Sequence, residues 1–202
     1  RRGEYDRAVR VHEHLLSRGD LKQTERDRAQ HALSLDFLKA GLLDRAEDAL
    51  AKLEGTRFEP QARLARLAVY ERTRDWPQAA RIAQQLQSAD QGDFSARIAH
   101  YLCEQALPLA QGDAQALEQA QQLLQEAIAT APDASRARIE LAALQSQAGL
   151  PDKAYATLAI VIEKAQAATP LVALRLQELA QECGQQPHAL KLLQDNYAQS
   201  HS

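Results

Sequence analysis

Apolar residues recur every three to four positions in short blocks along the chain, which is the pattern of amphipathic helices. The blocks share an opening in which a small or turn-forming residue is followed, within a few positions, by alanine. Further apolar residues come four and seven positions after most of these alanines, on the same helical face. Such blocks begin at positions 3, 41, 74, 116, 149 and 184. We therefore predict six amphipathic helices, each starting close to one of these positions.

A second set of periodic apolar segments lies between the blocks. The expected ranges of these segments are 27–40, 60–74, 94–110, 134–148 and 170–183. Each segment ends next to the following block, so the chain is predicted to form about five helical hairpins after a lone first helix. We expect the partner of that lone helix to precede Arg1 in a longer protein. Its apolar stripe, chiefly Val9, Val11, Leu15 and Leu16, would then be exposed, and two copies could pair through it.

The recurring alanines give the period of the repeat. They are spaced by 38, 33, 41, 34 and 35 residues, close to the 34-residue period of tetratricopeptide repeats. Alanine suits a point where two helices pass closely. We therefore predict an all-α, right-handed superhelical tetratricopeptide solenoid, with residues 1–202 as a single array and stacking continued across the polar linker after Ala89. The predicted packing alanines are Ala8, Ala46, Ala79, Ala120, Ala154 and Ala189.

Composition supports helices and argues against several partner classes. The chain holds 39 alanines and 30 leucines, against 11 valines and isoleucines together, so a sizeable sheet is not expected. A net charge of −3 predicts neither nucleic-acid binding nor direct membrane contact. The longest uncharged stretch, residues 141–151, is too short and polar to span a bilayer. The two cysteines lie too far apart in sequence for a disulfide framework or a CxxC zinc site.

Residues with reactive side chains do not form a recognisable catalytic motif. The sequence has no glycine-rich phosphate loop, no HExxH and no GxSxG. His100 and Cys103 share a helical face, but no further ligand is close in sequence, so we expect a buried thiol beside a partly exposed imidazole. His12, His14, Glu47 and Asp48 are interpreted as ordinary solvated groups. We expect no catalytic residue, metal site or cofactor in this chain, and an enzyme ranks last among the hypotheses.

The first helix of each hairpin is expected to line the concave wall of the solenoid. Charged groups on that wall predict a protein-binding surface, and the alternative is that they are merely solvated. Leu35 stands where the carboxylate clamp of chaperone-binding repeats needs asparagine, so we do not expect that clamp. The predicted groove residues are Arg28, His31, Lys39, Gln61, Glu71, Arg72, Arg136, Glu140, Arg175 and Glu178, with Gln147 and Glu182 on the same faces.

Three stretches carry more than generic repeat sequence. Residues 1–16 (RRGEYDRAVRVHEHLL), 40–50 (AGLLDRAEDAL) and 97–107 (RIAHYLCEQAL) resemble the lipopolysaccharide assembly protein B family. The resemblance runs in order over essentially all 202 residues. It is most specific around His100 and Cys103, which the repeat itself does not require. Family members carry a membrane anchor before the repeats and a rubredoxin-like zinc module after them, so this chain resembles the cytoplasmic repeat portion only.

The resemblance implies an adaptor rather than an enzyme. It implies a location at the cytoplasmic face of the bacterial inner membrane and a role in restraining lipopolysaccharide synthesis. The implied partners are the deacetylase that commits precursors to lipid A, a membrane AAA+ protease that receives it, and a membrane-embedded antagonist. Zinc would belong to the C-terminal module of the parent protein and not to this chain. The repeat pattern alone fits a scaffold for another envelope or secretion assembly equally well.

Overall fold

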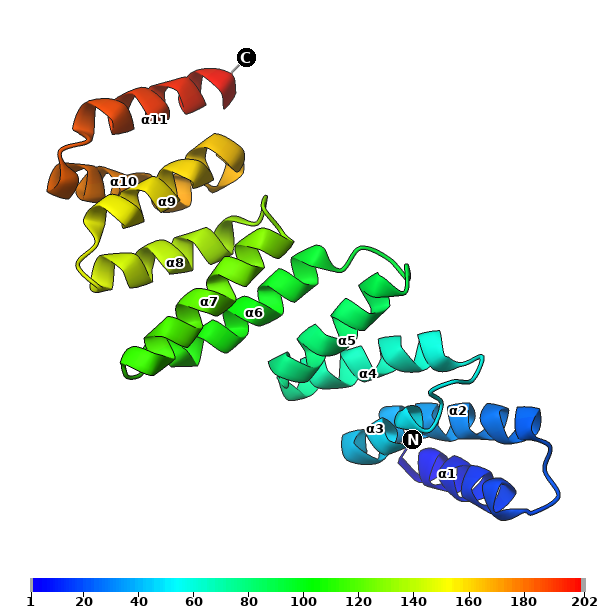
Figure 1. Cartoon of the computed structure of the whole chain (residues 1–202). Coiled ribbons are helices and arrows are strands. Elements are labelled where there is room, and N and C mark those ends of the chain that lie inside the picture. The colour runs from blue at the N-terminus through cyan, green and yellow to red at the C-terminus, as the bar shows by residue number, and fades with distance from the viewer. Residues whose placement is uncertain (1, 201–202) are drawn as a thin grey trace. The chain divides into compact units, whose positions relative to one another are not determined.

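A computed structural model describes residues 2–200 of the chain, and the regular secondary structure of this part consists of helices alone (Figure 1). It contains eleven α-helices and one short 3-10 helix, η1. Their bounds are α1 (Arg2–Ser17), α2 (Gln23–Ala40), α3 (Leu43–Ala51), α4 (Glu59–Thr73), α5 (Trp76–Ser88), α6 (Ser95–Leu109), α7 (Ala114–Thr130), α8 (Ser135–Gln147), α9 (Pro151–Lys164), η1 (Gln166–Ala168), α10 (Thr169–Cys183) and α11 (Gln186–Ser200). The predicted all-α class is confirmed, and the order of one helix followed by five helical hairpins is the order predicted for a helical solenoid. The second helix is longer than predicted, because it begins at Gln23 rather than position 27.

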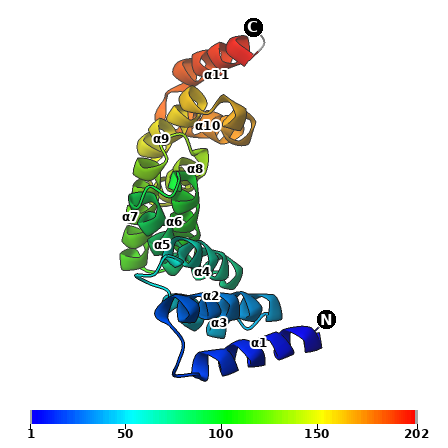
Figure 2. The same ribbon diagram turned by 90° about the vertical axis from the view of Figure 1, so that its right-hand side faces the viewer.

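The chain forms two compact units, Arg1–Asp93 and Phe94–Ser202. In the first unit, α1 packs against α2, α2 pairs with α3, and α4 pairs with α5 (Figure 2). In the second unit, the hairpins α6–α7, α8–α9 and α10–α11 stack in sequence order. The boundary falls at the polar linker after Ala89. Continuity of a single array over residues 1–202 stays a prediction.

Helix α1 packs differently from the prediction. Val9 is buried and contributes to a core with Leu33 and Phe37 of α2. Leu16 packs against the same core, whereas Val11 is 58% exposed. The predicted exposed stripe is therefore wrong for Val9 and Leu16, because α2 covers that face of α1.

Left-handed residues end several helices. Gly41 closes α2 at φ 77° and Gly184 closes α10 at φ 72°, a conformation that costs glycine little. Arg74 takes the same role after α4, with φ 59°. A non-glycine residue there is less favourable because of the steric clash of its Cβ. Helix α5 then begins at once, with Pro77 in its first turn and the Asp75 side chain accepting a hydrogen bond from the amide of Gln78.

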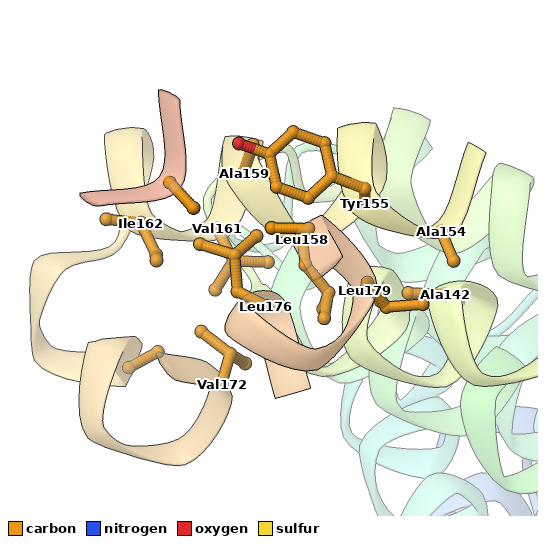
Figure 3. Packing of buried hydrophobic residues seen from close by; sticks show 13 residues of the cluster. Ala142, Ala154, Tyr155, Leu158, Ala159, Val161, Ile162, Val172, Leu176 and Leu179 are labelled. Atoms are coloured by element: carbon orange, nitrogen blue, oxygen red, sulfur yellow. The ribbon is translucent and has the colours of Figure 1, made fainter. Parts of the chain in front are cut away.

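One core cluster of the second unit lies where α9 meets α8, α10 and α11. Figure 3 shows Leu158 of α9 packed with Leu176 and Leu179 of α10. Ala154 lies within this cluster and has no exposed surface. Among the other recurring alanines, Ala46, Ala79, Ala120 and Ala189 are buried to 2% exposure or less, while Ala8 is only half-buried.

Two leucines of the periodic apolar segments 60–74 and 170–183 lie on the surface and not in the core. Leu64 is 45% exposed and Leu174 is 70% exposed. Leu174 stands two positions from the buried Val172 and Leu176, and two positions rotate a side chain about 200° around a helix. Leu174 therefore points away from the core that α10 shares with α9.

Candidate protein-interaction site

In the first unit, helix α2 presents the predicted residues Arg28, His31 and Lys39. Arg28 and Lys39 are exposed, and among the described residues neither has an ion-pair partner. His31 is half-buried because its ring stacks on Phe58, with centroids 4.7 Å apart and planes inclined by 15°. The Arg57 guanidinium lies over the same Phe58 ring at 4.8 Å from its centroid. Phe58 was not predicted as part of this surface; it lies just before α4, outside the helical periodicity.

Helix α4 places Gln61 and Arg72 at the surface, and Glu71 half-buried. Arg66 and Tyr70 make polar contacts on the buried side of this helix. Arg66 donates to Glu54 at 2.8 Å and to the Tyr70 hydroxyl at 3.2 Å. Tyr70 in turn donates to Glu47, so Glu47 is a structural acceptor and not the solvated group expected.

Burial acts on the Arg66–Tyr70 pair in opposite directions. Burial, followed by the hydrogen bond to Glu47, raises the pKa of Tyr70. Burial disfavours the charge of Arg66, but the contacts with Tyr70 and Glu54 outweigh it, and the pKa of Arg66 is raised. Tyr70 therefore stays a neutral donor at physiological pH, and this network stabilises the α3–α4 contact rather than offering reactive groups.

In the second unit, Arg136 of α8 joins three side chains on the predicted wall. It donates through Nε to Glu140 at 2.7 Å and through Nη2 to Glu104 of α6 at 2.8 Å. Its Nη1 lies 2.8 Å from Nδ1 of His100. Burial opposes the charge of Arg136, but the hydrogen bonds to Glu140 and Glu104 raise its pKa. The structure thus brings two predicted groove residues, Arg136 and Glu140, into one polar network with Glu104, which the sequence analysis missed.

Cys103 lies behind this network and is 1% exposed, whereas His100 is exposed, as predicted. Burial, with a further contribution from Glu140, raises the pKa of the Cys103 thiol to about 12. The thiolate is the nucleophilic and metal-binding form of cysteine. At neutral pH Cys103 is therefore an inert, buried thiol.

Helix α10 carries the remaining predicted groove residues, Arg175 and Glu178. Arg175 donates to Glu178 at 2.8 Å, lies 3.9 Å from Glu182, and also donates to Ser146 of α8. Beside these charges, α8, α9 and α10 enclose an apolar hollow of about 210 Å³. Leu171 forms part of its rim and is 77% exposed. Leu171, Leu174 and Glu178 share one helical face by their spacing, but hydrophobicity alone does not separate an exposed leucine from a core leucine.

His12 also departs from the prediction of a solvated imidazole. Its Nδ1 lies 2.7 Å from the Asp36 carboxylate, and the two side chains are 28% and 13% exposed. This contact ties α1 to α2. Within residues 2–200, no three His, Cys, Asp or Glu side chains converge as metal ligands. None of the helices described there is long and apolar enough to cross a bilayer.

Two comparisons with known proteins concern the repeat: one with a family profile and one with solved structures. A family profile described as tetratricopeptide repeat matches residues 109–179. The solved structure of the tetratricopeptide protein TTC0263 from Thermus thermophilus is 17% identical, with a TM-score of 0.37. That alignment covers 87% of this chain and 92% of the solved one.

Two curated relatives match nearly the whole chain. Lipopolysaccharide assembly protein B of Escherichia coli (strain K12) is 33% identical over 186 residues, which is 92% of this chain and 46% of that protein. The protein of the same name from Haemophilus influenzae is 28% identical over 185 residues, or 91% of this chain and 46% of the relative. The chain thus spans about half the length of the curated relatives it matches. A tetratricopeptide-repeat profile thus matches one part of the chain, and the resemblance to the lipopolysaccharide assembly protein B family is confirmed over 92% of it.

Proposed function

We propose that this chain is a non-catalytic adaptor that regulates lipopolysaccharide synthesis. In this proposal it presents the deacetylase of the committed step of lipid A synthesis to a membrane AAA+ protease, at the cytoplasmic face of the inner membrane. A membrane-embedded antagonist relieves the restraint. The observation that carries the proposal is the 33% identity with lipopolysaccharide assembly protein B over 92% of the chain.

The surface chemistry supports binding rather than catalysis. The candidate wall consists of exposed cations on α2 and α4 in one unit, and of paired charges beside an apolar hollow in the other. Proteins of this architecture use such walls to hold other polypeptides. The buried Cys103 thiol, with its raised pKa, does not supply a nucleophile at neutral pH.

A second candidate is a scaffold for another envelope or secretion assembly. The tetratricopeptide match over residues 109–179 does not separate the two candidates, because it identifies the repeat and not the partner. The partner recovered from cells separates them.

The test is a crosslinking pull-down from the cells that encode the chain, with an affinity tag at its chromosomal locus. The adaptor proposal expects the lipid A deacetylase and the AAA+ protease to be recovered together. A tagged variant in which Arg28 and Arg72 are both replaced by alanine should recover less of them. Arg81→Ala, an exposed arginine on the second helix of a hairpin, serves as the matched control. Recovery of a different assembly, with neither enzyme present, would contradict the proposal.

A further inference from the structure

The apolar hollow of the second unit is built entirely from side chains of α8, α9 and α10. Its lining residues are Ile139, Ala142, Ala143, Leu158, Leu171, Val172, Arg175 and Leu179. Figure 3 shows Leu158, Val172 and Leu179 close together. A cavity of roughly 150 Å³ can hold a benzene-sized group, so about 210 Å³ has room for one leucine, methionine or phenylalanine side chain.

Exposed leucines extend the apolar surface beyond the hollow. Leu171 and Leu174 lie one turn apart on α10, and they are 77% and 70% exposed. Leaving two adjacent leucines in water forgoes the stabilisation that burial would give. The surface of α10 next to α9 buries Val172, Leu176 and Leu179 instead, so the two exposed leucines have no role in that core.

An acidic surface continues from the hollow along α10. Arg175 is shared by both features: it lines the hollow and pairs with Glu178 and Glu182. Two carboxylates facing one guanidinium leave a net negative charge. The polar network of α6 and α8 has the same ratio of two carboxylates to one guanidinium, because Glu104 and Glu140 both pair with Arg136. A ligand that fills the hollow would therefore meet an excess of negative charge further along α10.

We infer that this surface binds an extended protein segment that carries one large apolar side chain and a nearby lysine or arginine. The apolar side chain fills the hollow against Leu171, and the cation meets Glu178 and Glu182. From Leu171 to these carboxylates is about 10–16 Å along the helix axis, at about 1.5 Å per residue. An extended segment covers that distance in about three to five residues. The inference rests on the proposed protein-interaction function and names the chemistry of the segment bound.

Charge argues against a second copy of the chain as the occupant. In a two-fold pairing centred on Glu178 and Glu182, their carboxylates would approach the same residues of the partner copy. Like charges brought together in this way disfavour association. A segment with a basic residue removes the excess charge instead.

The experiment pans a phage library of random twelve-residue peptides against the purified 202-residue chain. Enriched peptides are then made with a fluorescein label and titrated by fluorescence anisotropy. They should share a leucine, isoleucine, methionine or phenylalanine with a lysine or arginine about three to five positions away. Affinity should fall several-fold when salt is raised from about 50 to about 500 mM, because the charge contact is exposed.

Two variants test the site itself. Leu171→Ser should weaken binding about tenfold or more, because the contact with the apolar side chain is lost. The double variant Glu178→Gln and Glu182→Gln should weaken it several-fold and remove most of the salt dependence. Leu190→Ser and Glu163→Gln remove an exposed leucine and an exposed carboxylate elsewhere in the same unit, and should change affinity less than twofold. Circular dichroism verifies that each variant is folded.

Any of three binding results would overturn the inference. These are an absence of enriched peptides, enrichment of acidic peptides, and unchanged affinity in both site variants. A concentration-dependent dimer in sedimentation that Leu171→Ser abolishes would overturn it as well, by identifying a second copy as the occupant. If the peptides fail while the deacetylase and protease are still recovered from cells, only the assignment of this surface is wrong and the adaptor function stands.

Discussion

Ala154 offers a sharp test of how closely the helices of the second unit pack. It has no exposed surface and lies in the same cluster as Ala142, Tyr155 and Leu158. Ala154→Leu would add three carbon atoms at this point. Ala154 does not line the nearby hollow, so that space does not accommodate the larger side chain. Overpacking of a well-packed core costs about 1–3 kcal/mol.

Thermal unfolding followed by circular dichroism measures this cost. In a chain of this length each kcal/mol shifts the Tm by about 2–4 °C, so the Tm of the α8–α10 region should fall by about 2–12 °C. Hydrogen exchange should show faster exchange in α8, α9 and α10 than in the parent chain. Exchange in α2 and α3, which belong to the other compact unit, should be unchanged.

Ala156→Leu is the matched control, because it makes the same change two positions along α9 at an exposed site. Leucine and alanine have similar helix propensities, so this variant should stay within about 0.5 kcal/mol of the parent. Ala8→Leu should also cost less than Ala154→Leu, since Ala8 is only half-buried. Equal Tm values for Ala154→Leu, Ala156→Leu and the parent chain would refute the packing argument.

Three further predictions follow from individual sites. Gly41→Ala should lower the free energy of unfolding in urea by about 1–2 kcal/mol, because Gly41 has φ 77°. Gly19→Ala should be nearly neutral, since Gly19 has no positive φ and a Cβ there has equal space. Similar costs for both variants would contradict the strain argument. The pKa of Cys103 is raised from 9 to about 12, so the folded thiol stays protonated at a pH where the unfolded thiol ionises. The free energy of unfolding should therefore fall as pH rises from about 9 towards 12. This group contributes at most about 1.4 kcal/mol per pH unit. Replacing Cys103 by alanine should flatten that slope, and an identical slope in the variant would contradict the assignment. Arg28→Ala and Arg72→Ala should each change the free energy of unfolding by less than about 0.5 kcal/mol, because both side chains are exposed and unpaired among the described residues; a larger loss in chemical denaturation would show a structural role.

The repeat could be predicted from the sequence because one physical requirement recurs along the chain. Two helices that cross closely need a small residue, and this placed Ala46, Ala79 and Ala154 at regular intervals. Glycine at the left-handed ends of helices, as at Gly41, marked where hairpins turn. Both signals are local, so a single sequence contains them in full.

The candidate interaction surface was harder to predict, because its contacts join residues that are far apart in the sequence. The stripe of Arg136 and Glu140 follows from helical phase, but its link to Glu104 spans 32 residues. The exposure of Leu174 could not be predicted, because hydrophobicity alone does not say which face of α10 meets α9. Phe58 stacks on His31 from outside any regular helix, and periodicity gives no information there.

In the proposed function the chain restrains lipid A synthesis by delivering the deacetylase for degradation. The decisive measurement is the half-life of that deacetylase, followed by immunoblot after protein synthesis is stopped in the cells that encode the chain. Deleting the gene should lengthen the half-life, and restoring the unaltered gene should shorten it again. An unchanged half-life after deletion would contradict the adaptor account and leave the chain as a scaffold for another assembly.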